Sequence, residues 1–397
     1  MLYNGDMETA AQLSLLSQDM DLEPDGGPGS EAGGGLECKP VIGGRSLGEI
    51  PITEAALPGG RRIKLLKTLL TSACERNCYY CPFRAGRDYR RATFKPDDMA
   101  KTFMALHEAK AAEGLFLSSG IAGGGIRTQD RLIDTAEILR KKYRYRGYLH
   151  LKIMPGAERD QVLRAMQLAS RLSVNLEAPN TSRLEKLAPN KQFTEELLEP
   201  LQWIEQIRHE QSPHQTWNGR WPSTVTQFVV GAVGETDLEL LSTSERLYRD
   251  SRLQRVYYSA FRPIADTPLE NLPAENPIRQ NRLYQSSFLL RDYGFDLEEM
   301  PFEPSGNLPL DVDPKLAWAR THLAGRPVEV NRAGKVELIR VPGIGVKGAE
   351  RILQARRLNR ILDAADLTKL GIQVKRAAPF VLLMGKQPAH QPALFEA

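Results

Sequence analysis

The chain has 397 residues, 41% of them hydrophobic and 26% charged, with a formal net charge of +4. This composition is ordinary for a soluble globular protein with one large and one small domain, and the charge is too small to indicate nucleic-acid binding by itself. We expect a cytoplasmic protein without disulfides, signal peptide or membrane span, because it has only four cysteines, no basic and apolar leader, and no long apolar run.

The first 45 residues differ from the rest of the chain. Residues 22–35 are rich in Gly, Pro and acidic side chains. Such a run buries too little apolar surface to offset its chain entropy. We therefore predict a disordered segment over residues 1–45, with Cys38 in a plain loop, and a folded domain over residues 60–300.

Within residues 60–300, short apolar runs alternate with longer amphipathic stretches. This alternation is typical of β-α-β units around a parallel sheet. The predicted strands are residues 63–70, 115–118, 148–154, 172–177, 225–230 and 255–261. The predicted helices are residues 96–112, 131–143, 159–170 and 237–248. The pattern predicts an α/β fold, a partial TIM barrel of the (β/α)6 type.

Several predicted strands carry polar side chains at every second position. His150 and Lys152 share one face of their strand, and Asn175 and Glu177 share one face of another. Polar residues in the lumen, near the carboxyl ends of barrel strands, are where such folds keep their chemistry. The alternative is that these side chains only complete a buried hydrogen-bond network.

Three cysteines, Cys74, Cys78 and Cys81, follow the first predicted strand with C-x3-C-x2-C spacing. Three thiolates on one loop can bind three irons of a [4Fe–4S] cluster and leave the fourth iron open for a small-molecule ligand. A zinc site is the alternative, but it needs a fourth protein ligand. Cys38 lies far away in the sequence, and all six histidines lie outside the loop.

The cysteine loop resembles that of the radical SAM superfamily, in which S-adenosylmethionine (SAM) chelates the open iron, and Tyr80 matches the aromatic residue usual before the third cysteine. The resemblance implies that an external one-electron donor, such as flavodoxin or ferredoxin, reduces the cluster. SAM is then cleaved to methionine and a 5′-deoxyadenosyl radical that abstracts hydrogen from a substrate. His150 and Lys152 are the candidates for substrate contact or proton transfer.

The same resemblance implies a SAM-binding cradle on the later strands. Residues 118–120 occupy the place of the segment that receives the SAM amino group, and Asn175 and Glu177 that of the polar residues near the ribose or methionine part. Gly231 and Tyr258 fall where the family contacts the adenine. The implied cofactor-binding residues are Tyr80, Ser118, Ser119, Gly120, Asn175, Glu177, Gly231 and Tyr258.

After an amphipathic stretch over residues 279–293 and a Pro-rich linker over residues 301–326, a second motif appears. Residues 338–353 predict two helices joined by a hairpin at residues 342–345. Gly343 and Gly345 permit a tight turn whose free N–H groups suit a phosphate. This motif resembles a helix-hairpin-helix, which contacts the DNA backbone without reading sequence.

A weaker copy of this motif spans residues 366–381, where Gln373 replaces the second hairpin glycine. We predict a small all-α domain of two helix-hairpin-helix motifs over residues 327–390. Basic residues outnumber acidic ones there, which favours a polyanion as ligand. The candidate nucleic-acid-binding residues are Gly343, Gly345, Lys347, Lys375 and Arg376. A protein-docking or packing role is the alternative.

The two motifs together resemble the DNA modification or repair radical SAM proteins associated with uracil-DNA-glycosylase-like partners. This implies an enzyme on nucleic acid, with DNA favoured over RNA, although a phosphate-binding hairpin does not distinguish the two. A base inside a duplex cannot reach a barrel lumen, so the substrate would be single-stranded or flipped. One alternative is a radical SAM enzyme on a small molecule or peptide, with the hairpins as docking module. Another is a non-enzymatic iron–sulfur protein that binds DNA.

Overall fold

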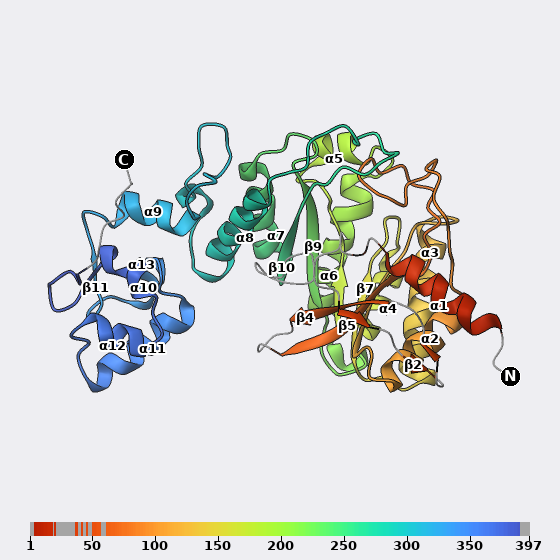
Figure 1. The fold of residues 1–397 in the computed structure, drawn as a ribbon, viewed down its shortest axis with the longest axis horizontal. Helices are drawn as coiled ribbons and strands as arrows, with labels where there is room; N and C mark the ends of the chain where they lie inside the picture. The colour runs from red at the N-terminus through yellow and green to blue at the C-terminus, as the bar shows by residue number, and fades with distance from the viewer. Residues whose placement is uncertain are drawn as a thin grey trace. The chain divides into compact units, whose positions relative to one another are not determined.

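The computed structural model describes residues 4–18, 20, 36–38, 41–42, 45–46, 50–56 and 61–389 (Figure 1). They fall into two compact units. The first contains residues up to 235 together with 246–280, and the second contains residues 236–245 and those from 281 onward.

The first unit is built on one sheet whose strands β5 to β10 are parallel neighbours in chain order (Figure 1). These strands are β5 (Arg62–Leu69), β6 (Gly114–Ser118), β7 (Tyr148–Lys152), β8 (Arg171–Ser173), β9 (Ser223–Val230) and β10 (Arg255–Ala260). The α/β fold with a curled half-barrel sheet is therefore confirmed. Two antiparallel strands extend it beyond β5, namely β4 (Ile50–Ala56) and β1 (Leu36–Cys38).

Helices connect these strands and bury their apolar faces. In α2 (Pro96–Glu108), for example, Met99, Phe103 and Leu106 are buried at helical spacing. The others are α3 (Gly125–Glu137), α4 (Arg159–Leu168), α5 (Thr181–Leu187), α6 (Glu199–Glu210) and α7 (Asp237–Asp250). Three short segments are η2 (Ile138–Lys142), η3 (Phe193–Leu198) and η4 (Pro213–Gln215).

Helix α3 begins six residues before the predicted start at residue 131. Gly125 opens it, and a Cβ there would lie 2.2 Å from the carbonyl oxygen of Pro155. Only glycine allows this close approach of the helix to the β7–α4 connection. Glycine is a poor helix former, whereas this helix needs it at its start for packing.

Strand β8 is shorter than the predicted strand over residues 172–177. The Thr226 hydroxyl donates to the carbonyl of Val174 (2.6 Å) and accepts from the N–H of Leu176 (3.2 Å). A side chain thus replaces regular ladder bonds, and the strand bulges. Glu177 then rejoins β9 as an isolated bridge to Phe228, with φ of +64°.

The expectation of disorder over residues 1–45 is wrong where the structure describes them. Residues Asn4–Ser17 form α1, in which Leu13 and Leu16, three positions apart, are fully buried. An apolar pair at helical spacing gives the segment a face to pack against the sheet. Cys38 ends β1 rather than lying in a plain loop, and β2 (Val41–Ile42) pairs with β3 (Arg45–Ser46). The Gly- and Pro-rich residues 22–35 lie outside the described residues.

The second unit is a small helical body. Its elements are most of α7 and most of α8 (Pro277–Asp292), then η5 (Leu297–Glu299), α9 (Pro314–His322), β11 (Val328–Glu329), α10 (Lys335–Arg340), α11 (Val346–Leu358), α12 (Ala364–Lys369), α13 (Val374–Ala377), η6 (Ala378–Phe380) and β12 (Val381–Leu382). Residues 301–326 are not simply a linker. Asp313 caps α9 by accepting from the N–H of Leu316, and Trp318 packs into the core of the unit.

Two similar hairpins pack against each other in this unit. Gly343 has φ of +82°, and its carbonyl accepts from the N–H of Gln373 (3.2 Å). A Cβ on Gly343 would lie 2.5 Å from the carbonyl oxygen of Gln373. Gly345 and Gln373 have φ of −94° and −77°, so the second copy needs no glycine where Gln373 stands.

Replacing Gly343 by alanine should therefore destabilise this unit by roughly 1–3 kcal/mol, the cost of a strained backbone conformation. Urea titration of the full chain measures this change. Gly345→Ala is the matched control, because its Cβ meets only the Tyr293 hydroxyl, at 3.4 Å. Equal losses in the two variants would show that the positive φ and the contact with the second hairpin are unimportant.

A partly buried lysine supports the first hairpin. Lys315 on α9 donates to the carbonyl of Ile344 (2.6 Å), and burial, reinforced by the charge of Arg376, lowers its pKa from 10.5 to about 7. Between these values the unfolded chain binds more protons than the folded one. The free energy of unfolding should therefore rise with pH, by at most about 1.4 kcal/mol per unit.

Denaturant titrations between pH 7 and 10 test this dependence. In Lys315→Met the contribution of Lys315 to this dependence should disappear, so the free energy of unfolding should change less with pH than in the wild type. Parallel profiles for the two proteins would contradict it.

Candidate active site

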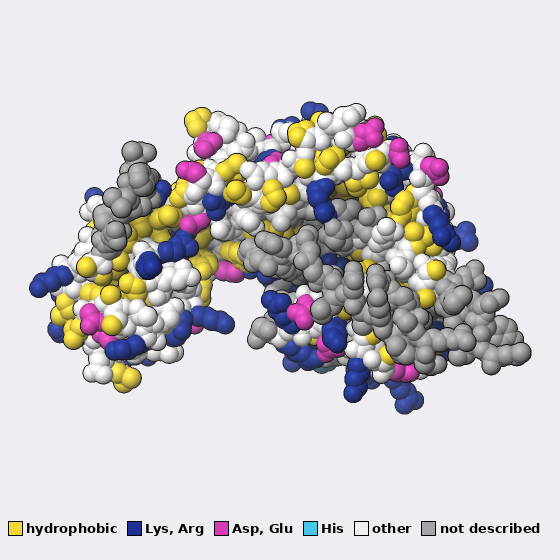
Figure 2. Space-filling view, in the orientation of Figure 1, with side chains coloured by type: hydrophobic (Ala, Val, Ile, Leu, Met, Phe, Trp, Pro, Cys, Tyr) yellow, Lys and Arg dark blue, Asp and Glu magenta, His cyan; other side chains and the backbone are white. Residues whose placement is uncertain are grey.

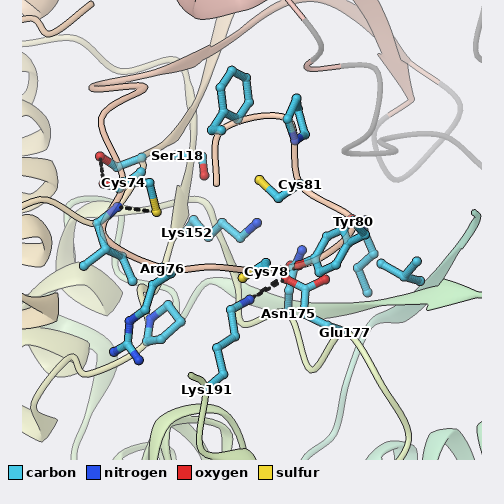
Figure 3. A pocket seen from close by; sticks show the side chains of 18 of the residues that line it. Cys74, Arg76, Cys78, Tyr80, Cys81, Ser118, Lys152, Asn175, Glu177 and Lys191 are labelled. Carbon is cyan, nitrogen blue, oxygen red and sulfur yellow. Dashed lines mark hydrogen bonds and ion pairs between the residues drawn. The ribbon is translucent and has the colours of Figure 1, made fainter. Parts of the chain in front are cut away.

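One pocket of the first unit lies at the carboxyl ends of the parallel strands, with about 1080 Å³ of empty space including its mouth (Figure 3). Ser118 ends β6, Lys152 ends β7, and Asn175 and Glu177 follow β8. The three clustered cysteines line the same pocket. Barrel folds assemble their catalytic sites at this face.

The cysteine loop forms no regular helix or strand and is held by backbone contacts. The N–H of Tyr79 donates to the carbonyl of Leu187 (2.9 Å), and the N–H of Ile121 donates to Cys74 Sγ (3.4 Å). The three cysteines carry free thiols. Burial raises the pKa of Cys78, and it raises that of Cys81 to about 12. Metal binding at these thiols must therefore displace protons.

The donor set fits an iron–sulfur cluster better than zinc. Among the described residues, no three His, Cys, Asp or Glu side chains converge closely enough to hold a single metal ion. Zinc requires such convergence, because its bonds to sulfur are about 2.3 Å long. A four-iron cluster is larger and takes its cysteines at separate corners. Figure 3 shows Cys74, Cys78 and Cys81 placed around one hollow in this way.

The glycine-rich segment after β6 lies directly against the cysteine loop. The N–H of Gly120 donates to the carbonyl of Thr71 (2.7 Å), and a Cβ on Gly120 would lie 2.3 Å from the carbonyl oxygen of Ala73. The Glu75 carboxylate accepts from the N–H groups of Gly123 (3.1 Å) and Gly124 (3.2 Å). Only glycine at position 120 allows this spacing between the two loops.

A buried ion pair borders the cysteines. Lys191 Nζ lies 3.2 Å from Glu177 Oε1 and 3.4 Å from the Tyr80 hydroxyl. Burial opposes the charge of both partners. The positive charges of Lys191 and Lys152 nevertheless lower the pKa of Glu177, and the charges of Cys78 and Glu177 raise the pKa of Lys191. The pair is therefore charged at neutral pH.

Most of the predicted cofactor residues line this pocket. Beside the cysteines and Lys152, they are Tyr80, Ser118, Ser119, Gly120, Asn175 and Glu177. Their common position follows from the parallel sheet, which brings the carboxyl ends of its strands to one edge.

Three predicted residues do not line the pocket. His150 lies two residues before Lys152, fully inside the barrel, with its ring 4.4 Å from that of Phe116. Burial and the nearby Arg171 lower its pKa, so it is neutral. Tyr258 is buried beside Phe228, on the opposite face of β10 from Ser259, which does line the pocket.

Gly231 also lies outside the pocket, in a turn with φ of +91°. The Glu235 carboxylate accepts from its N–H, and a Cβ there would meet the carboxylate of Glu275 at 2.1 Å. Gly231 is needed for this turn. Because it does not line the pocket, its position does not support the predicted contact with adenine.

Sequence reasoning missed three cations of the pocket, Arg76, Lys191 and Arg262. Arg76 lies between the first two cysteines, so its place in the motif was a usable signal. It pairs with Glu196 and donates to the carbonyl of Asn190. Lys191 follows α5 in a segment with no strand or motif, so no sequence signal marks it.

In the second unit, three of the candidate phosphate contacts are exposed. Lys347 lies in the first turn of α11, and Lys375 and Arg376 lie in α13. Arg376 also pairs with Asp313. Gly343 and Gly345 lie in the first hairpin, which contacts the second through Gly343 and Gln373.

Residues 68–246 match the family model of the radical SAM superfamily. These residues form a radical SAM domain. Members of the superfamily are enzymes that use a [4Fe–4S] cluster and SAM and need an electron donor, and these are the cofactors of the domain that the match covers. No helix of the described residues is long and apolar enough to span a membrane. No curated protein matches the chain.

Solved structures of radical SAM enzymes show partial similarity. Methylornithine synthase PylB has a TM-score of 0.45 and 17% identity over 59% of this chain and 64% of its own. The hydrogenase maturase HydG from Carboxydothermus hydrogenoformans has a TM-score of 0.43 and 14% identity, and the match covers 57% of this chain and 51% of HydG. The methyltransferase TsrM from Kitasatospora setae has a TM-score of 0.38 and 13% identity, and the match covers 55% of this chain and 39% of TsrM. The matches thus span less than two thirds of each of these proteins.

Proposed function

We propose that Cys74, Cys78 and Cys81 bind three irons of the cluster and leave the fourth iron to SAM. The observation that carries this proposal is the convergence of the three free thiols and the carboxyl ends of the parallel strands β5 to β10 on one pocket. Residues 118–120 lie against the cysteine loop through Gly120. They are the proposed contact for the SAM amino group.

The cofactors, once bound and reduced, supply hydrogen-atom abstraction. The protein's own residues position the reactants and exclude water. Asn175 and the Glu177–Lys191 pair present polar groups at the pocket wall, where they can orient the ribose or methionine part of SAM. Lys152, at the end of β7, is the candidate for substrate contact.

We further propose that the substrate is a nucleic acid, DNA rather than RNA. The packed pair of hairpins and the exposed Lys347, Lys375 and Arg376 support a second unit that binds the phosphate backbone. Figure 2 shows Lys and Arg side chains across the visible face of this unit. A target base must be single-stranded or flipped to enter the pocket. A uracil-DNA-glycosylase-like partner is consistent with such a substrate.

A second candidate function keeps the radical chemistry but uses the second unit to dock a protein. Leu358 and Leu362, on this unit, are 83% and 62% exposed. Exposed apolar side chains this close in sequence favour a partner surface. The substrate would then be a small molecule or peptide.

Anaerobic incubation with SAM, dithionite and single-stranded DNA separates the two functions. Digestion of the DNA and mass spectrometry should show a modified nucleoside that is absent with Cys78→Ala. Cleavage of SAM without any changed nucleoside in DNA or RNA would contradict the nucleic-acid substrate and favour the docking function.

A further inference from the structure

Residues 187–196 form a segment that contacts one side of the cysteine loop. The carbonyl of Leu187 accepts from the N–H of Tyr79, the carbonyl of Asn190 accepts from Arg76, and Glu196 pairs with Arg76. These contacts are fixed by backbone groups and an ion pair. A side chain carried by this segment therefore has a defined position relative to the cysteines.

Lys191 is the side chain that this segment directs toward the cysteines. Figure 3 shows it beside Cys78, joined to Glu177 by the ion pair. Its side chain is only 9% exposed, and both Lys191 and Cys78 line the pocket. Its ammonium also lies 5.9 Å from the centre of the Tyr80 ring. A positive charge is thus held at the cysteine loop with little access to water.

A charge in this position acts on the redox equilibrium of the cluster. A [4Fe–4S]²⁺ core with three thiolates carries a net charge of −1, and reduction by one electron makes it −2. A nearby cation stabilises the more negative state, and this effect is large where water is excluded. Net charge around a cluster is one of the factors that set its potential.

We propose that Lys191 raises the reduction potential of the cluster by serving as its fixed counter-charge, with Glu177 offsetting part of the effect. The inference rests on the proposed function, because it takes the three cysteines as ligands. In the step concerned, one electron passes from the external reductant to the cluster. No bond forms or breaks at Lys191, and it keeps its proton.

Anaerobic redox titration of the reconstituted full chain without SAM, followed by electron paramagnetic resonance, tests the proposal. Lys191→Met should lower the equilibrium constant for one-electron reduction at least tenfold, which is a shift of about 59 mV to more negative potential. Lys191→Arg should restore most of the wild-type value. Lys186→Met removes the same charge from an exposed position on α5 and should leave the potential unchanged.

Glu177→Gln provides an independent test if Lys191→Met retains too little cluster to titrate. This change removes the offsetting negative charge, so the potential should move in the positive direction. A wild-type potential in a fully loaded Lys191→Met protein, or a negative shift in Glu177→Gln, would overturn the proposal. Absence of a cluster from the wild type would instead refute the three-cysteine site itself.

Discussion

Replacing Cys78 by alanine is expected to reduce bound iron from about four atoms per chain toward zero and to abolish SAM cleavage. Cys78 is buried at the pocket between the other two ligand candidates in the sequence. A cluster already lacking a fourth protein ligand has no replacement for it in this loop. Iron and sulfide analysis after anaerobic reconstitution, with the visible absorption of the cluster, measures the loss.

Cys38→Ala is the matched control for this experiment. Cys38 ends β1 and is the only other cysteine of the chain. The proposal gives it no role as a ligand, so iron content and SAM cleavage should remain at the wild-type level. Loss of the cluster in Cys38→Ala, or its retention in Cys78→Ala, would contradict the three-cysteine site.

The second large effect is expected from reversing charge at the hairpins. Lys347→Glu combined with Lys375→Glu should weaken binding of DNA of every sequence and lower the slope of log affinity against log salt by about 2. Each lysine is exposed and free to neutralise a phosphate at the hairpin pair. Fluorescence anisotropy with labelled single-stranded and duplex DNA at several salt concentrations gives both quantities.

Lys101→Glu combined with Lys186→Glu makes the same change in net charge at exposed positions of the first unit. This control should lose much less affinity and keep the wild-type slope. Equal losses in the two double variants would show that general charge, rather than the hairpins, determines binding. No DNA binding by the wild type would favour the docking function of the second unit.

The sequence predicted the elements whose pattern is local. The six parallel strands follow from short apolar runs that alternate with amphipathic stretches, and the cysteine loop follows from the positions of three residues. Asn175 and Glu177 line the pocket, although they follow β8 in a bulged segment where strict alternation of side chains does not hold. The bulge after β8 was not predictable, since it depends on the hydroxyl of Thr226 in a strand 50 residues away.

The remaining differences have the same origin in tertiary contacts. Lys191 reaches the cysteines only because its segment packs against the cysteine loop. Gln373 replaces a glycine of the first motif, but its φ is negative, so the position does not require glycine. His150 shares a strand face with Lys152, yet it lies one pleat deeper and outside the pocket. The alternation of side chains predicts which face of a strand a residue lies on, but not whether its position along the strand reaches the pocket.

The proposed role of the cysteine pocket is to bind a cluster that cleaves SAM. The most direct test incubates the reconstituted protein anaerobically with dithionite and SAM and measures 5′-deoxyadenosine by mass spectrometry, beside Cys78→Ala. The account predicts 5′-deoxyadenosine from the wild type and none from the variant. No 5′-deoxyadenosine from a wild-type protein that carries an intact cluster would contradict it.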